Sequence, residues 1–209
     1  IGAIWADPGG KSNAGESYVI FGSGNTPSTF DPATLNGSNG FVINGIDPAD
    51  AIGWSVSAAG DVNGDGLDDI IVGAPHADPN GRNSAGESYV IFGQDNMSAS
   101  IDLSFLNGAN GFAIHGANAD DLSGLSVSSA GDVDGDGFDD LLVGASSADP
   151  NGQIDAGSSY LIFGDASFSA IFDLAMLDGS NGFVLNGVAS HDHAGVSVST
   201  SGDLNGDGY

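Results

Sequence analysis

The sequence predicts an all-β fold built from repeated four-stranded antiparallel units, and two observations carry this prediction. First, the loop Asp61-Val-Asn-Gly-Asp-Gly-Leu-Asp-Asp69 recurs 71 residues later as Asp132-Val-Asp-Gly-Asp-Gly-Phe-Asp-Asp140, and it begins again at Asp203. A period of this kind indicates a row of similar supersecondary units. Second, the segments between the loops are short apolar or alternating runs, rich in β-formers and bounded by Gly, Asn, Asp or Pro, which is typical of strands.

The length of the unit favours one architecture for these strands. In the second unit we expect them at residues 69–74, 88–92, 112–115 and 126–130. Four antiparallel strands fit a β-propeller blade or part of a β-solenoid. Solenoid coils take about 20 to 30 residues and blades about 40 to 50 plus loop insertions, so a 71-residue unit favours a propeller. We expect one propeller segment over 1–209, about three blades long, with repeats near 1–71, 72–142 and 143–209.

Two stretches of each unit carry more specific expectations. Ile70-Ile-Val72 is apolar on successive residues, which is typical of a strand that is buried on both faces. The segment Ile101-Asp-Leu-Ser-Phe-Leu-Asn-Gly lies between two expected strands and could form a helical turn. We interpret it, and its copies at Phe30 and Phe172, as an excursion between strands.

The aspartate-rich loop has the spacing of a site for a hard cation. In the first copy, positions 1, 3 and 5 are Asp61, Asn63 and Asp65, which places oxygen ligands on one side of a tight turn. A glycine follows at position 6, Leu67 at position 7 would offer its backbone carbonyl, and Asp69 at position 9 would close the site. Calcium accepts six to eight oxygens in irregular geometry, whereas zinc and copper prefer sulfur or imidazole ligands that this loop lacks.

The second and third copies supply the remaining candidate ligands, which are Asp132, Asp134, Asp136, Phe138, Asp140, Asp203, Asn205 and Asp207. The loop is not an EF-hand, because position 12 is Val72 or Val143 in place of a glutamate and the flanks are expected strands. Asp, Asn and Gly are also common turn residues, so a plain turn is the alternative. Carboxylates a few ångströms apart repel by about 4 kcal/mol per pair at a dielectric near 20, which favours the calcium interpretation.

The composition excludes several classes of partner. The chain has 28 acidic residues against two basic ones, Lys11 and Arg82, and a net charge of -26. This charge argues against binding nucleic acid or an anionic membrane surface. No stretch approaches 18 apolar residues, so we expect no membrane insertion, and the absence of cysteine excludes disulfides.

Three motifs together resemble the FG-GAP repeats of the integrin α-subunit propeller. They are Phe-Gly at 21–22, 92–93 and 163–164, Gly-Ala-Pro at 73–75 with variants at 2–4 and 144–146, and the aspartate-rich loop. The resemblance covers essentially the whole chain. It implies a propeller, commonly of seven blades, with calcium in the loop that joins the first two strands of a blade, on the face opposite the usual ligand site. The repeats are longer than is usual for the family, and their near-identity suggests recent duplication, as in bacterial surface proteins.

The third repeat stops at Tyr209, before its closing ninth position, so we expect Asp203, Asn205 and Asp207 to bind weakly unless another segment completes that loop. Three blades are also too few to close a propeller. Two sources of the remaining blades stay open. They could come from a longer chain, which we favour, or from head-to-tail self-association.

The resulting expectation is a non-catalytic, calcium-binding propeller module for adhesion or protein interaction, secreted or at the cell surface, where calcium would stabilise the loops. A glycan-binding propeller using non-periodic residues is one alternative, with candidates Trp5, Trp54, His76 and Asp120. An accessory domain of a secreted enzyme is another. Catalysis has weak support. His191-Asp-His193 has no counterpart in the other repeats and could form a metal pair or a base, but we favour a solvated loop. No nucleophile elbow, phosphate-binding loop or zinc motif is present.

Overall fold

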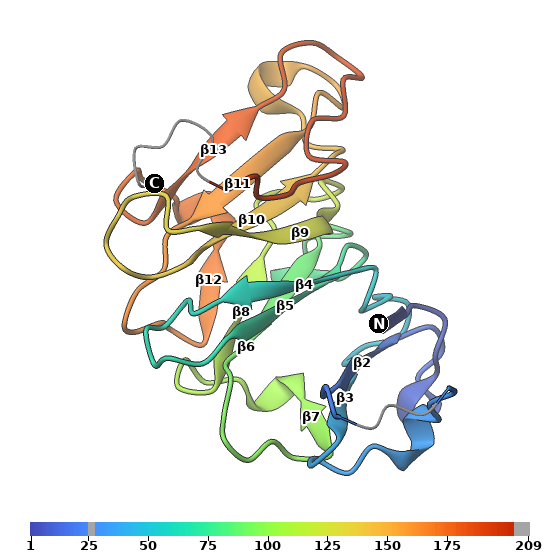
Figure 1. Cartoon of the computed structure of the whole chain (residues 1–209). Helices are drawn as coiled ribbons and strands as arrows, with labels where there is room; N and C mark the ends of the chain where they lie inside the picture. The colour runs from blue at the N-terminus through green and yellow to red at the C-terminus, as the bar shows by residue number, and fades with distance from the viewer. Residues whose placement is uncertain (25–27, 203–209) are drawn as a thin grey trace.

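The computed structural model describes residues 1–24 and 28–202 and confirms the all-β prediction. Three separate sheets follow one another in an arc, each twisted and packed face to face with the next (Figure 1). The described residues contain no α-helix, only short 3₁₀ turns. None of these turns is long and apolar enough to cross a membrane. The arrangement is that of consecutive propeller blades in a ring that these three sheets do not close.

Each sheet draws its strands mainly from one stretch of chain. The first sheet has the order β1-β2-β3-β7, with bounds Gly2–Ala3, Glu16–Ile20, Gly40–Asn44 and Ser100–Asp102. The second has the order β12-β8-β6-β5-β4, with bounds Ile171–Asp173, Gly111–His115, Glu87–Ile91, Asp69–Ala74 and Ser55–Gly60. The third has the order β13-β11-β10-β9, with bounds Gly182–Asn186, Ser158–Ile162, Asp140–Ala145 and Ser123–Gly131.

The expected strands of the second unit are all present, within three residues at each end. They are β5, β6, β8 and β9, and neighbours within one blade pair antiparallel. In the third unit, the run Ser197-Val-Ser, which corresponds to residues 126–128 of β9, forms no strand. A strand needs a hydrogen-bonded neighbour, and among the described residues no segment pairs with this run as β10 pairs with β9.

The excursion between the third and fourth strands of a blade crosses to the preceding sheet. Its strand β12 pairs parallel with β8, and the equivalent β7 pairs parallel with β3. The expected helical turns follow as 3₁₀ turns, η4 at Leu103–Phe105 and η6 at Leu174–Met176. Asp102 and Asp173 cap these turns by accepting backbone N–H bonds from Ser104 and Ala175, at 3.0 Å each. Each repeat therefore lends a strand to its neighbour.

The hydrophobic core lies between the sheets. One cluster joins the first and second sheets around Phe41, Ile43 and Val72, and another joins the second and third sheets around Ile71, Phe112 and Leu141. Ile71 and Val72 are both fully buried, and they face opposite clusters. The expectation of a strand buried on both faces is therefore confirmed for β5, and each sheet depends on its neighbours for burial.

The glycine of the Gly-Ala-Pro motif lets the sheets come close together. A Cβ added to Gly73 would lie 2.0 Å from the carbonyl oxygen of Gly124, which belongs to the next sheet. The same 2.0 Å clash would arise between Gly144 and the carbonyl of Gly195. A side chain at Gly73 would separate the second and third sheets, and one at Gly144 would displace the segment that contains Gly195, so the packing requires glycine at both positions.

Both basic residues of the chain lie at equivalent positions between repeats. The guanidinium of Arg82 donates to both carboxylate oxygens of Asp173, at 3.3 and 2.6 Å, and to the carbonyl of Ala117 at 2.8 Å. Arg82 thereby helps to hold β12 beside β8 in the second sheet. One repeat earlier, Lys11 and Asp102 line the same cavity but form no hydrogen bond. The third repeat has Gln153 at this position.

Replacing Arg82 with glutamine should test this contact with a residue that the fold already accepts. We expect Arg82→Gln to lower the free energy of unfolding by about 1 kcal/mol, because the pair is bidentate but only partly buried. Urea denaturation measures the change, which should shrink in molar salt. Lys11→Gln is the matched control and should cost less. Equal costs for the two substitutions would contradict a specific role for the Arg82 pair.

Candidate metal centre

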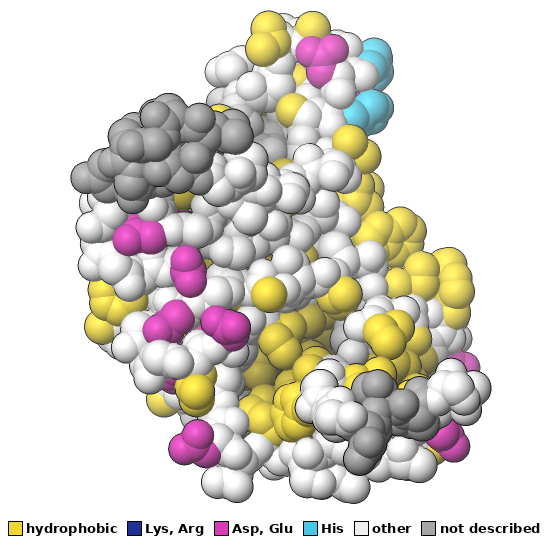
Figure 2. All heavy atoms as spheres, in the orientation of Figure 1, with side chains coloured by type: hydrophobic (Ala, Val, Ile, Leu, Met, Phe, Trp, Pro, Cys, Tyr) yellow, Lys and Arg dark blue, Asp and Glu magenta, His cyan; other side chains and the backbone are white. Residues whose placement is uncertain are grey.

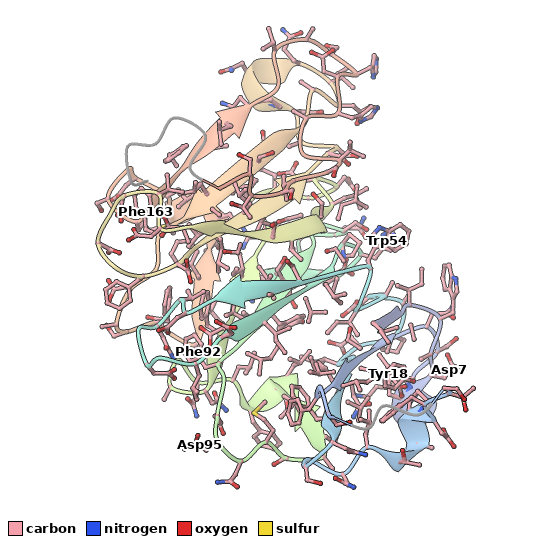
Figure 3. All side chains as sticks on the ribbon, in the orientation of Figure 1. Asp7, Tyr18, Trp54, Phe92, Asp95 and Phe163 are labelled. Carbon is pink, nitrogen blue, oxygen red and sulfur yellow. The ribbon has the colours of Figure 1, made fainter. Side chains whose placement is uncertain are left out.

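The aspartate-rich loops join the first two strands of a blade, β4 to β5 and β9 to β10. Both loops lie at the same edge of the molecule, because β4 and β9 are equivalent strands of neighbouring sheets. Figure 2 shows acidic side chains gathered along the left side of the view. Phe92 and Phe163, which precede the glycines of the Phe-Gly motif, lie at this edge, and Trp54 lies at the opposite edge (Figure 3).

The second loop brings three carboxylates together. One oxygen from each of Asp132, Asp134 and Asp136 lies within 4.8 Å of the others. Backbone N–H groups hold this arrangement: the Asp132 carboxylate accepts from Gly135 and Asp136 at 2.7 and 3.1 Å, and from Gly137 at 3.0 Å. The loop therefore wraps around the first aspartate, and the carboxylates at positions 3 and 5 turn toward it.

The first loop has the same wrapping with one carboxylate fewer. Asp61 accepts from the N–H groups of Asp65 and Gly66, at 3.0 and 2.9 Å. The amide of Asn63 occupies position 3, where its oxygen accepts from the Asp65 N–H at 2.9 Å and its nitrogen donates to the Asp65 carboxylate at 3.0 Å. The two loops share a backbone path and differ in charge.

The ninth-position aspartates have a structural role that the spacing did not predict. Asp140 is fully buried, and its two oxygens accept from Val133 N–H at 2.7 Å and Gly164 N–H at 2.9 Å. Asp69 bonds in the same way to Val62 and Gly93, at 3.0 and 2.9 Å. Each aspartate therefore ties its loop to the glycine of the Phe-Gly motif. Burial raises the pKa of both carboxyls to about 6, although the N–H donors oppose the rise.

The structure thus groups some of the expected ligands and leaves others apart. Asp132, Asp134 and Asp136 form the acidic triad, to which Asp140 does not belong. Asp61, Asn63 and Asp65 share one hydrogen-bonded turn. Leu67 and Phe138 take position 7, where their N–H groups donate to Asp65 and Asp136 at 2.9 and 3.0 Å. Asp203, Asn205 and Asp207 lie outside the described residues.

A second acidic group lies in the loop between β3 and β4, at the edge opposite the metal loops. Burial, with further contributions from the carboxylates of Asp47, Glu87 and Asp78, raises the pKa of Asp50 to about 7. One repeat later, Asn118 replaces Asp47, and its backbone N–H and side-chain amide both donate to Asp121 at 3.2 Å. The recurrence of Asp50 as Asp121 and Asp192 is the sequence signal for this group.

His191 and His193, the candidate residues for catalysis, contact different partners. Nδ1 of His191 lies 3.4 Å from the carboxylate of Asp155, and Nδ1 of His193 lies 3.0 Å from the carbonyl oxygen of Ser146. Their ring centroids are 6.5 Å apart. They do not converge on one described residue.

The non-periodic residues proposed for glycan binding are partly brought together. Trp54 packs edge-on against His76, with ring centroids 5.5 Å apart, and both side chains are exposed. Trp5 is 68% exposed at the position equivalent to His76. Asp120 accepts a hydrogen bond from the side chain of Asn83 at 3.0 Å.

The double acceptor role of Asp140 predicts a cost that needs no metal. We expect Asp140→Asn to lower the free energy of unfolding by about 1 to 3 kcal/mol in chelator at pH 8, because the amide nitrogen would face a buried N–H donor. Asp134→Asn, at an exposed position of the same loop, should cost less than about 0.5 kcal/mol under these conditions. Urea unfolding compares the two variants, and similar costs would disprove the structural role of Asp140.

The raised pKa of Asp50 predicts a pH dependence. Because the folded pKa of about 7 lies above the ordinary value of 3.8, protonation favours the folded state, and this contribution is complete below about pH 4 and lost as the pH rises through 7. Relative to Asp50→Asn, the wild-type chain should therefore lose stability between pH 4 and pH 8. Urea midpoints across this range measure the difference. Asp47→Asn, which reproduces the second repeat, should reduce the loss, and parallel pH curves for wild type and Asp50→Asn would contradict the assignment.

Comparison with known proteins identifies the repeats. The FG-GAP repeat family matches residues 52–91 and 123–162, which contain the two complete aspartate-rich loops and the strands that flank them. These matches confirm the resemblance drawn from the three motifs.

Curated relatives point the same way. The chain is 41% identical to Integrin alpha pat-2 of Caenorhabditis elegans over 101 residues, covering 48% of this chain and 8% of the relative. It is 31% identical to Integrin alpha-5 of Xenopus laevis over 173 residues, covering 80% of this chain and 15% of the relative. It is also 35% identical to Phosphatidylinositol-glycan-specific phospholipase D of Bos taurus over 117 residues, covering 56% of this chain and 14% of the relative. The chain thus spans a small part of these relatives, and it carries FG-GAP repeats related to those of integrin alpha subunits.

Proposed function

We propose that the chain is a non-catalytic propeller module for adhesion or protein interaction outside the cytoplasm, and that calcium bound in its aspartate-rich loops stabilises it. Similarity to integrin alpha subunits supports the interaction role. The acidic triad of the second loop is the observation that carries the calcium role.

The donor set of the triad fits calcium. Calcium binds oxygens at about 2.3 to 2.6 Å, so ligands on opposite sides of the ion lie up to about 5 Å apart. Triad oxygens within 4.8 Å of one another suit such a sphere. Asp132, Asp134 and Asp136 would hold the ion, and the carbonyl of Phe138 is the further candidate. A bound divalent ion would offset the repulsion between the carboxylates and so stabilise the turn between β9 and β10.

The charge difference between the loops supports a ranking of sites. Affinity for calcium rises with the number of charged ligands. The second loop has carboxylates at positions 1, 3 and 5, whereas the first has an amide at position 3. The second site should therefore bind more tightly than the first.

An accessory domain of an enzyme is the second candidate. Its support is the similarity to Phosphatidylinositol-glycan-specific phospholipase D, whose name states an activity that this chain would serve without supplying the catalytic residues. The exposed Trp54 and His76 pair supports the glycan-binding alternative more weakly, since an exposed aromatic pair is compatible with many surfaces. A glycan array separates that alternative from a protein-binding module.

Removing calcium should lower the melting temperature of the chain. At a calcium concentration about 100 times the dissociation constant, each site adds about 2.7 kcal/mol. Differential scanning calorimetry in calcium and in EGTA measures this, with magnesium as the control ion. Exchanging the position-3 residues tests the ranking: Asp134→Asn should weaken the second site, and Asn63→Asp should strengthen the first. An unchanged melting temperature in EGTA would remove calcium from the proposal.

A further inference from the structure

The two aspartate-rich loops are in direct contact. The N–H group of Asp61 donates to the carboxylate of Asp139 at 2.8 Å, and the N–H group of Asp139 donates to the carbonyl of Asp61 at 3.0 Å. These residues are 78 positions apart in the sequence. Asp139 is position 8 of the second loop, yet its hydrogen bonds fix the first residue of the first loop.

The first loop is shaped to receive this contact. Gly60 has φ +77°, and a Cβ there would lie 2.2 Å from the Oδ2 atom of Asp139. Gly64 has φ +73°, and a Cβ there would lie 2.4 Å from the ring of Phe138. A side chain at Gly60 would therefore displace the Asp139 carboxylate, and one at Gly64 would displace the Phe138 ring.

Burial at the loop confirms that the next repeat covers it. Val62 is fully buried, and its carbonyl accepts from the N–H of Asp165 at 3.2 Å. Its equivalent in the second loop, Val133, is 38% exposed. Gly131, the equivalent of Gly60, has nearly the same φ of +74° but no atom within 4 Å of its Cβ position among the described residues.

We propose that Asp139 is a positioning residue for the cation site of the first loop, so that two successive repeats build this site together. The inference rests on the proposed calcium function. Asp139 holds the backbone of Asp61, and the Asp61 carboxylate in turn holds the N–H groups of Asp65 and Gly66. Without the Asp139 carboxylate, the N–H group of Asp61 would lose its acceptor, and the backbone of this first ligand would be less constrained. Outer-shell contacts of this kind commonly change metal affinity.

The proposal specifies which of the two calcium sites loses affinity when Asp139 is replaced. By sequence, Asp139 belongs to the second loop and flanks the candidate ligands Phe138 and Asp140. A local effect would therefore weaken the second site. The contact across the repeats instead requires that the first site weakens.

Calorimetric calcium titration of the full chain can read each site separately. In every protein the third loop is silenced by Asp203→Ala with Asp207→Ala. Asp134→Ala with Asp136→Ala then leaves the first site, and Asn63→Ala with Asp65→Ala leaves the second. Adding Asp139→Ala should weaken the first site about tenfold, the lower end of outer-shell effects, and change the second site much less.

Three further comparisons separate positioning from a general loss of charge or fold. Asp139→Asn keeps an oxygen that can accept from the Asp61 N–H, so it should restore most of the affinity. Asp68→Ala removes the equivalent carboxylate of the first loop, which forms no hydrogen bond to another loop among the described residues, and should have the smaller effect on the first site. Gly60→Ala should weaken the first site more than Gly131→Ala weakens the second, although both replace a glycine of positive φ.

The outcomes distinguish this inference from the calcium proposal. If neither site binds calcium before Asp139 is changed, the proposed function fails and this inference fails with it. If both sites bind and Asp139→Ala leaves the first unchanged, or weakens the second as much, only the role of Asp139 is overturned. A selective loss at the first site, restored by asparagine, supports it.

Discussion

Contact between neighbouring sheets is the constraint on which the rest of the structure depends. Neither hydrophobic cluster lies within one sheet, since each fills the space between two. The inner strand β5 gives Ile71 to one cluster and Val72 to the other, so the second sheet buries apolar side chains against both of its neighbours. The glycines at 73 and 144 follow from the same constraint, because the backbone of the following repeat occupies the place of a side chain. The Gly-Ala-Pro motif is therefore a requirement of packing between repeats.

Charged side chains at the repeat boundaries also contribute to the contact between neighbouring repeats. A chain of net charge -26 has two basic side chains, and both lie where one repeat lends a strand to the sheet before it. Elsewhere, backbone N–H groups satisfy the carboxylates, as they do for Asp69, Asp140 and Asp132. This explains how aspartates can be buried without a basic partner. The cost appears as the raised pKa values of Asp69 and Asp140, whose burial outweighs their hydrogen bonds.

The periodic features could be predicted from sequence, and the contacts between repeats could not. The spacing of the aspartate-rich loops and the β-rich runs between them predicted the strands of each blade, since local patterning determines which residues face a core. The triad at 132, 134 and 136 followed from alternating positions on a tight turn. The parallel pairing of β12 with β8 was missed, because a three-residue strand has no pattern that names its partner. The contact of Asp139 with Asp61 was missed for a related reason, since loop spacing assigns a residue to its own loop and not to the next.

The crossing strands have a consequence for synthesis of the chain. The outer edge of the second sheet, along β8, is covered by β12, which the ribosome produces only after the next blade has begun. Until then the nascent sheet presents unpaired backbone groups at that edge, the kind of surface that templates aggregation. Each new repeat would cover the exposed edge of the preceding sheet. Its own sheet would then present an unpaired edge until the following repeat is made. Aggregation risk in an array of such repeats therefore depends on how fast translation supplies the next repeat, in addition to the stability of the finished fold.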